Sequence, residues 1–198
     1  MKRLLAALTL LLAACAGPGP TSTPSNVPRG WVVLSMVTEV TYAPAILYIR
    51  PVGASDGGGM GLVVMDAFGG NIQKLGAATG VVKAASYPPG TYEVFNFYLE
   101  AAGVPKRTYK SREDFALRFE VKANEVAYLG EFVATRTQVK GLVDWISGPT
   151  PYFIRADRRE RDLAIATKAT PELQGLPAQS VVLTPAKPTP FIQAGRVE

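Results

Sequence analysis

The chain has 198 residues, with 21 Lys and Arg, 16 Asp and Glu, one cysteine and no histidine. This length suits a single domain whose core is large enough to fold without covalent cross-links. The missing histidine and single cysteine exclude disulfides within one chain, Ser-His-Asp and Cys-His catalysis, and zinc or copper sites built on thiolate or imidazole. Carboxylate, lysine, serine and tyrosine chemistry remains open.

The first fifteen residues, MKRLLAALTLLLAAC, have the form of a secretory signal. Lys2 and Arg3 give a positive start, and the residues from 4 to 12 are apolar. That apolar run is too short to span a bilayer, which needs about 20 residues. Without Lys2 and Arg3, 19 basic residues remain against 16 acidic ones. Such a mild excess gives little reason to expect nucleic-acid binding.

The signal ends in Leu12-Ala13-Ala14-Cys15, which resembles the lipobox of bacterial lipoproteins. The resemblance implies that diacylglycerol alkylates the Cys15 thiol, that the chain is cleaved between Ala14 and Cys15, and that the new amino group is acylated. Residues 1–14 are then the signal peptide. Three acyl chains make a durable anchor, whereas one chain binds a membrane only marginally. The alternative is an ordinary secretory signal with a chance cysteine.

Residues 15–30 follow as the lipidated cysteine and a flexible tether. The stretch after Cys15, AGPGPTSTPSNVPRG, holds four Pro and three Gly, so it cannot bury a core. Fully extended, it reaches at most about 50 Å. Ala16 stands where, under the lipoprotein sorting rule of enteric bacteria, Asp retains a protein in the inner membrane. The resemblance therefore implies an outer-membrane lipoprotein facing the periplasm.

From Trp31 the sequence becomes β-branched and apolar, and it predicts strands over 31–38, 45–52 and 62–67. Pro44 and Pro51 bracket the second strand and indicate a sheet edge or a strand terminus. The glycine-rich residues 53–61 are predicted to form a hairpin loop between the second and third strands. They lack the lysine, Ser/Thr and following helix of a phosphate-binding loop.

A further strand is predicted over 80–86, and Pro89-Gly90 then predicts a type II turn. The strand after it, 91–99, is rich in aromatic residues, namely Tyr92, Phe95, Phe97 and Tyr98. Aromatics on both faces of one strand indicate either a central strand of the core or an exposed aromatic face. An exposed face would suit carbohydrate or protein contacts.

Residues 115–121 alternate between apolar and polar side chains, as in a half-buried strand, and 126–135 predicts another strand, so 115–135 is predicted to be a hairpin. The Pro-Pro-Gly-Thr-Tyr-Glu-Val stretch at 88–94 and the segment 119–130 resemble transthyretin-like accessory domains and uncharacterised envelope lipoproteins. The resemblance implies a mainly β fold, an antiparallel sandwich of transthyretin or Ig type, here with one short C-terminal helix.

That helix is predicted over 158–169, after a strand over 152–156, with Asp157 as N-cap and Glu160 completing a capping box. A closing strand over 179–183 ends a domain spanning 31–184, and the Pro-rich residues 185–198 are predicted to be a loose tail. Four arginines near the helix start suit a phosphate or an anionic glycan, whereas interleaved acidic residues favour self-pairing; the arginines are Arg155, Arg158, Arg159 and Arg161.

No known catalytic or metal-binding motif is present. Two of the scattered carboxylates could still meet as a glycosidase-type pair, the candidates being Glu93, Glu100, Glu113, Asp114, Glu120, Glu125 and Glu131. We expect a non-catalytic binding or structural module of the envelope, without cofactor or metal, held by its lipid and contacting a protein or glycan. The alternatives are a carboxylate-dependent glycan hydrolase and an accessory domain of a secretion or efflux assembly.

Overall fold

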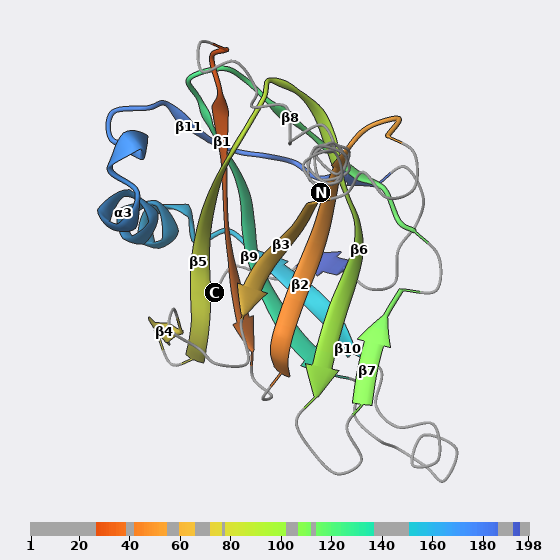
Figure 1. Ribbon diagram of the computed structural model, residues 1–198. Coiled ribbons are helices and arrows are strands. Elements are labelled where there is room, and N and C mark those ends of the chain that lie inside the picture. The colour runs from red at the N-terminus through yellow and green to blue at the C-terminus, as the bar shows by residue number, and fades with distance from the viewer. Residues whose placement is uncertain are drawn as a thin grey trace, which may run out of the picture.

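The computed structural model describes residues 27–38, 42–54, 60–65, 72–76, 78–101, 107–111, 114–136, 151–185 and 192–194. The signal peptide, Cys15 and most of the tether lie outside these ranges, so the expectations about them stay predictions. The described chain is mainly β, with two sheets and one short helix, as predicted (Figure 1).

Sheet A has seven strands, in the order β13 (Ile192–Ala194), β10 (Pro151–Ala156), β9 (Val126–Arg136), β1 (Gly30–Thr38), β5 (Ala78–Tyr87) and β4 (Gln73–Leu75), with β11 (Ala178–Ser180) also paired to β9. Sheet B has six strands, in the order β12 (Thr184–Pro185), β8 (Leu117–Val121), β6 (Gly90–Ala101), β2 (Tyr42–Pro51) and β3 (Met60–Met65), with β7 (Arg107–Lys110) also paired to β6. Helix α3 (Arg159–Ala169) lies outside sheet A beside β1 and β5, and a short 3-10 helix, η2 (Pro171–Leu173), follows it (Figure 1).

The strand directions differ between the sheets. All described pairs of sheet B are antiparallel. Sheet A is mixed, because β1 and β11 run parallel to β9, and β13 runs parallel to β10. The expectation of an antiparallel architecture therefore holds for sheet B and is wrong for sheet A.

The two sheets enclose one main core, which alternate residues of their facing sides fill. The burial pattern of β8 follows the sequence alternation strictly, with Leu117, Phe119 and Val121 buried and the residues between them exposed. Burying each large apolar side chain contributes about 1.5–3 kcal/mol. Among its fully buried side chains the bulkiest are Phe97, Phe132, Phe153, Leu34, Met36, Leu47, Ile49 and Leu99.

A second, smaller apolar cluster lies on the other side of sheet A, under α3. It joins Val33 of β1 and Tyr128 of β9 to Ala166 of the helix and Leu173 after it. Strands β1 and β9 are thus buried on both faces, which is why consecutive residues in them are apolar.

The structure corrects several local predictions around β2. This strand lies between β6 and β3, so the edge interpretation of its prolines is wrong. Pro51 is the last residue of the strand, as the alternative held, and Pro44 falls at a register shift between Tyr42 and Ala45. Strands β2 and β3 pair antiparallel, as the predicted hairpin requires, although residues 55–59 of the loop are outside the described part.

The predicted type II turn at Pro89-Gly90 is wrong. Gly90 has a φ of 157°, far from the value near +80° that this turn needs. The segment instead crosses from β5 in sheet A to β6 in sheet B. The Tyr92 hydroxyl donates to the Pro88 carbonyl over 2.9 Å, and its ring meets the Tyr87 ring edge-on, 5.3 Å between centroids, so both side chains fasten the crossing.

The predicted hairpin over 115–135 is also wrong, because its two strands belong to different sheets. Strand β8 belongs to sheet B and β9 to sheet A, so residues 122–125 form a second crossing. Asn124 takes a left-handed φ of 58°, which Asn tolerates better than most residues. Val121 pairs with Gly90, so the two crossings lie side by side.

The C-terminal helix follows the prediction closely, whereas the closing strand predicted over 179–183 covers only Ala178–Ser180, and part of the predicted loose tail forms strands. Helix α3 covers 159–169, and Asp157 accepts a hydrogen bond of 2.9 Å from the Arg159 amide, although the N-cap position itself is Arg158. The predicted capping box is incomplete, because no described hydrogen bond runs from Glu160. Of the tail, Pro185 belongs to β12, and Ile192–Ala194 pair with β10 at the edge of sheet A.

Candidate functional site

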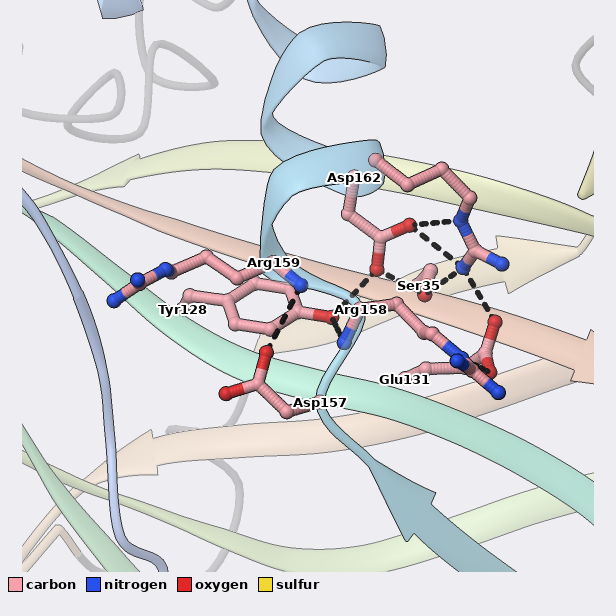
Figure 2. Close-up of polar contacts among 8 residues, drawn as sticks. Ser35, Tyr128, Glu131, Asp157, Arg158, Arg159 and Asp162 are labelled. Atoms are coloured by element: carbon pink, nitrogen blue, oxygen red, sulfur yellow. Dashed lines mark hydrogen bonds and ion pairs between the residues drawn. The ribbon is translucent and has the colours of Figure 1, made fainter. Parts of the chain in front are cut away.

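The most organised polar constellation is the helix clasp, which we define as Ser35, Tyr128, Glu131, Arg161 and Asp162 (Figure 2). Ser35 and Tyr128 point outward from β1 and β9, and each donates a hydrogen bond of 2.6 Å to the same carboxylate oxygen of Asp162. Arg161 donates to the other oxygen through Nε, at 2.9 Å, and Nη2, at 2.7 Å. Its Nη2 also forms an ion pair with Glu131.

Four of the five clasp residues are buried, and the Arg161 side chain is 29 % exposed. Ser35, Tyr128 and Asp162 are 0 % exposed and Glu131 is 6 % exposed. Burial raises the pKa of the Tyr128 hydroxyl far above its usual range, and the neighbouring Asp162 raises that pKa further. Burial lowers the pKa of Arg161, but Glu131 and Asp162 more than offset this, so the arginine stays charged.

This arrangement suits attachment of the helix rather than chemistry on a solvent-borne substrate. No buried side-chain N or O atom among the described residues lacks a hydrogen-bond partner. The Ser35 hydroxyl donates its hydrogen bond to the Asp162 carboxylate of α3, and both side chains are inaccessible to solvent. The clasp therefore uses its charges to fix α3 on sheet A.

The structure divides the four arginines of the predicted basic patch. Arg161 belongs to the clasp, and Arg158 lies 3.7 Å from Glu131. Arg155 is half-buried and donates hydrogen bonds to the backbone carbonyls of Leu129 in β9 and of Val181 after β11. Burial lowers the pKa of its guanidinium. Only Arg159 of this group is exposed without an ion pair to a described residue. Self-pairing is thus observed, between buried carboxylates and partly exposed arginines.

A second charged cluster lies on sheet B, centred on Arg50 of β2. Its Nε lies 2.7 Å from Glu93 and its Nη1 3.0 Å from Asp114. The hydrogen bond to Glu93 raises the pKa of Arg50. Asn96 also donates to Asp114 over 3.0 Å, and the guanidinium lies 4.2 Å from the centre of the Phe95 ring. Two of the candidate carboxylates, Glu93 and Asp114, therefore meet, but each is paired with the same arginine.

The aromatic residues of β6 divide between its two faces. Tyr92 and Phe97 are buried in the main core, as the core interpretation required. Phe95 and Tyr98 face the other side and are half-buried; Phe95 packs near Tyr48, with ring centroids 6.0 Å apart. The exposed-face interpretation therefore applies at most to this second pair.

A surface hollow of about 230 Å³ lies between β8 and β11, beside the second sheet crossing; its lining residues are Glu120, Lys122, Glu125, Val126, Ala127, Gln179, Ser180, Val181 and Val182. We call it the β8–β11 hollow. Two further candidate carboxylates, Glu120 and Glu125, thus share one concave surface. Of the other candidates, Glu100 accepts a hydrogen bond of 3.0 Å from Tyr98, and Glu113 lies outside the described residues.

Within the described ranges, no group of three or more Cys, Asp or Glu side chains is placed to hold a metal ion. No described helix is long and apolar enough to cross a membrane. The predicted lipidation and cleavage residues, Cys15 and Ala14, lie outside the described part of the chain.

Comparison with known proteins gives no family. No family model matches the chain, and no curated protein matches it. Among solved structures, it is similar to a leucine-rich repeat protein from Bacteroides thetaiotaomicron, at 15% identity and a TM-score of 0.33. The match covers 54% of this chain and 14% of that one. Function must therefore be argued from the residues themselves.

Proposed function

We propose that the chain is a lipid-anchored protein of the bacterial envelope whose two-sheet domain serves as a non-catalytic binding or structural module. The observation that carries this proposal is the sequence Leu12-Ala13-Ala14-Cys15, followed by a Pro/Gly-rich stretch that leads into the folded domain. Ala16 after the anchoring cysteine favours the outer membrane, with the domain in the periplasm.

The fixed charges of the domain support a non-catalytic role. Glu93 and Asp114 both pair with Arg50, and Glu131 and Asp162 both pair with Arg161. These four carboxylates are therefore engaged in contacts that hold the elements of the fold together.

The fold type belongs to the same proposal. We assign the domain to the transthyretin- or Ig-like sandwiches. Tyr92 supports this assignment, because it stands just after a sheet crossing and its hydroxyl bonds to the carbonyl of Pro88, four residues upstream. This geometry resembles the tyrosine corner of Ig-type sandwiches.

The anchor is tested by growing cells that express the chain with a clickable palmitate analogue. Cys15 is the only cysteine, so thiol-linked label on this protein reports that one residue. The native chain should be labelled and shortened, whereas Cys15→Ser should be unlabelled and remain a full-length precursor. Label that survives in Cys15→Ser would contradict the anchor.

The module role is tested by crosslinking the anchored protein in intact envelopes and recovering it under denaturing conditions. The proposal expects a reproducible protein or glycan adduct, and the unanchored Cys15→Ser chain is the matched control. Recovery of the native chain without any adduct would count against a binding role. Hydrolysis of an envelope glycan by the purified chain, lost in Glu120→Gln or Glu125→Gln, would replace it with the hydrolase alternative.

A further inference from the structure

The charged side chains of the β8–β11 hollow differ in their pairing from those of the helix clasp and the Arg50 cluster. The carboxylates of the helix clasp and of the Arg50 cluster are paired with arginines. By contrast, no described residue forms a hydrogen bond or ion pair with the side chains of Glu120, Glu125 or Lys122. The hollow therefore offers two free carboxylates and one free ammonium on a single concave surface.

The turn that carries two of these charges is held rigidly by its backbone. The Asn124 amide donates to the Arg29 carbonyl, and the Glu125 carbonyl accepts from the Trp31 amide, both over 2.9 Å. The Val126 amide donates to the Pro177 carbonyl, also over 2.9 Å. Three hydrogen bonds to two separate segments thus fix this crossing, so Lys122 and Glu125 project from a preorganised base, which reduces the entropic cost of binding.

The opposite wall is fixed as well. Residues 178–180 pair in parallel with β9, and the Ser180 hydroxyl donates to Asp157 over 2.7 Å. At the rim, Val182 is 81 % exposed, the most exposed large apolar side chain among those described. The hollow consequently combines charges of both signs with an apolar contact point.

We propose that the β8–β11 hollow binds a small zwitterion that carries a primary ammonium and a carboxylate, as found at the ends of a short peptide or in a free amino acid. The ammonium is recognised by Glu120 and Glu125, the carboxylate by Lys122, and a short aliphatic side chain packs on Val182. The volume of about 230 Å³ is below the roughly 300–1,000 Å³ of drug-sized sites, which restricts the ligand to this size. This inference names a ligand for the proposed binding module and rests on that role.

The test uses the full-length chain in detergent micelles and follows backbone amide shifts by NMR during titration with Ala-Ala. We expect saturable shifts at Ala127, Gln179 and Val182. N-acetyl-Ala-Ala lacks the ammonium and Ala-Ala-amide lacks the carboxylate, so each should bind at least tenfold more weakly, equivalent to about 1.4 kcal/mol. Free alanine separates the two sources, because equal binding indicates an amino acid and weaker binding a peptide end.

The variants Glu125→Gln and Lys122→Gln should each weaken Ala-Ala binding at least tenfold, while Glu160→Gln, an exposed carboxylate on α3, should leave it unchanged. Far-UV circular dichroism confirms that each variant is folded. Absence of saturable shifts, equal binding of the acetylated or amidated peptide, or equal loss in Glu160→Gln would overturn the proposal. Such a result leaves palmitate labelling and envelope crosslinking untouched, so the two proposals fail separately.

Discussion

Replacing Asp162 by Ala tests whether the helix clasp holds α3 on sheet A. Its carboxylate is 0 % exposed and accepts four hydrogen bonds, one each from Ser35 and Tyr128 and two from Arg161. Removing one partner of a buried ion pair costs about 3–5 kcal/mol, because the remaining partners are left unsatisfied. Arg161 keeps its ion pair with Glu131, so we expect the lower half of that range.

The loss is measured by urea unfolding of Asp162→Ala against the native chain. A loss of about 3 kcal/mol corresponds to a fall in Tm of about 6–12 °C for a domain of this size. Glu160→Ala on the same helix is the control, and an exposed substitution of this kind should stay within about 0.5 kcal/mol. The reasoning is refuted if Asp162→Ala loses less than about 1 kcal/mol, the size of one ordinary hydrogen bond, or no more than the control.

Two further predictions concern the same side of the molecule. Gly130→Ala should lower the free energy of unfolding by about 1–3 kcal/mol in urea, because φ is +111° and the new Cβ would lie 2.8 Å from Arg155 Nε. Gly175→Ala is the control, since Gly175 has a positive φ but open space around an added Cβ, and it should lose less. An equal loss in both variants would contradict the steric argument. Burial raises the pKa of Asp157, but hydrogen bonds from Ser180 and the following backbone, with nearby arginines, bring it below its ordinary 3.8. Its stabilisation is therefore present above pH 4 and is lost as the pH falls through the lowered pKa. Asp157→Asn should flatten the stability curve in that acid range, and an unchanged curve would count against the pairing.

The strands and the helix were predictable because their patterns depend on local rules. Alternation over 115–121 reports one buried face, and the burial of β8 follows it residue by residue. The run of charges after Asp157 marks a helix start that the structure places within one residue. These patterns depend only on which face of the element is buried against the core. They are the same whichever strand is its neighbour in the sheet.

Strand partners were not predictable by the same means. The pattern around residues 122–125 fits a hairpin as well as a crossing between sheets. Alternation of apolar and polar residues indicates which face of a strand is buried, but it does not indicate which strand it pairs with. The continuous apolar run from Val126 to Leu129 was a usable signal, since a strand that is apolar on both faces belongs inside a sheet. The clasp also had a signal in the sequence. Ser35 is a hydroxyl residue in the middle of an apolar run, and a buried hydroxyl requires a hydrogen-bond partner.

The position of β1 has a mechanical consequence under the proposed N-terminal anchoring. The proposed tether enters the domain at Gly30, the first residue of β1, where an added Cβ would lie 2.2 Å from the Lys122 carbonyl oxygen. Strand β1 is paired along nine residues with β5 and along eight with β9. Tension directed along β1 is therefore shared by the hydrogen bonds of two ladders. Such a strand is a suitable point of attachment for a domain that is pulled between a membrane and a partner.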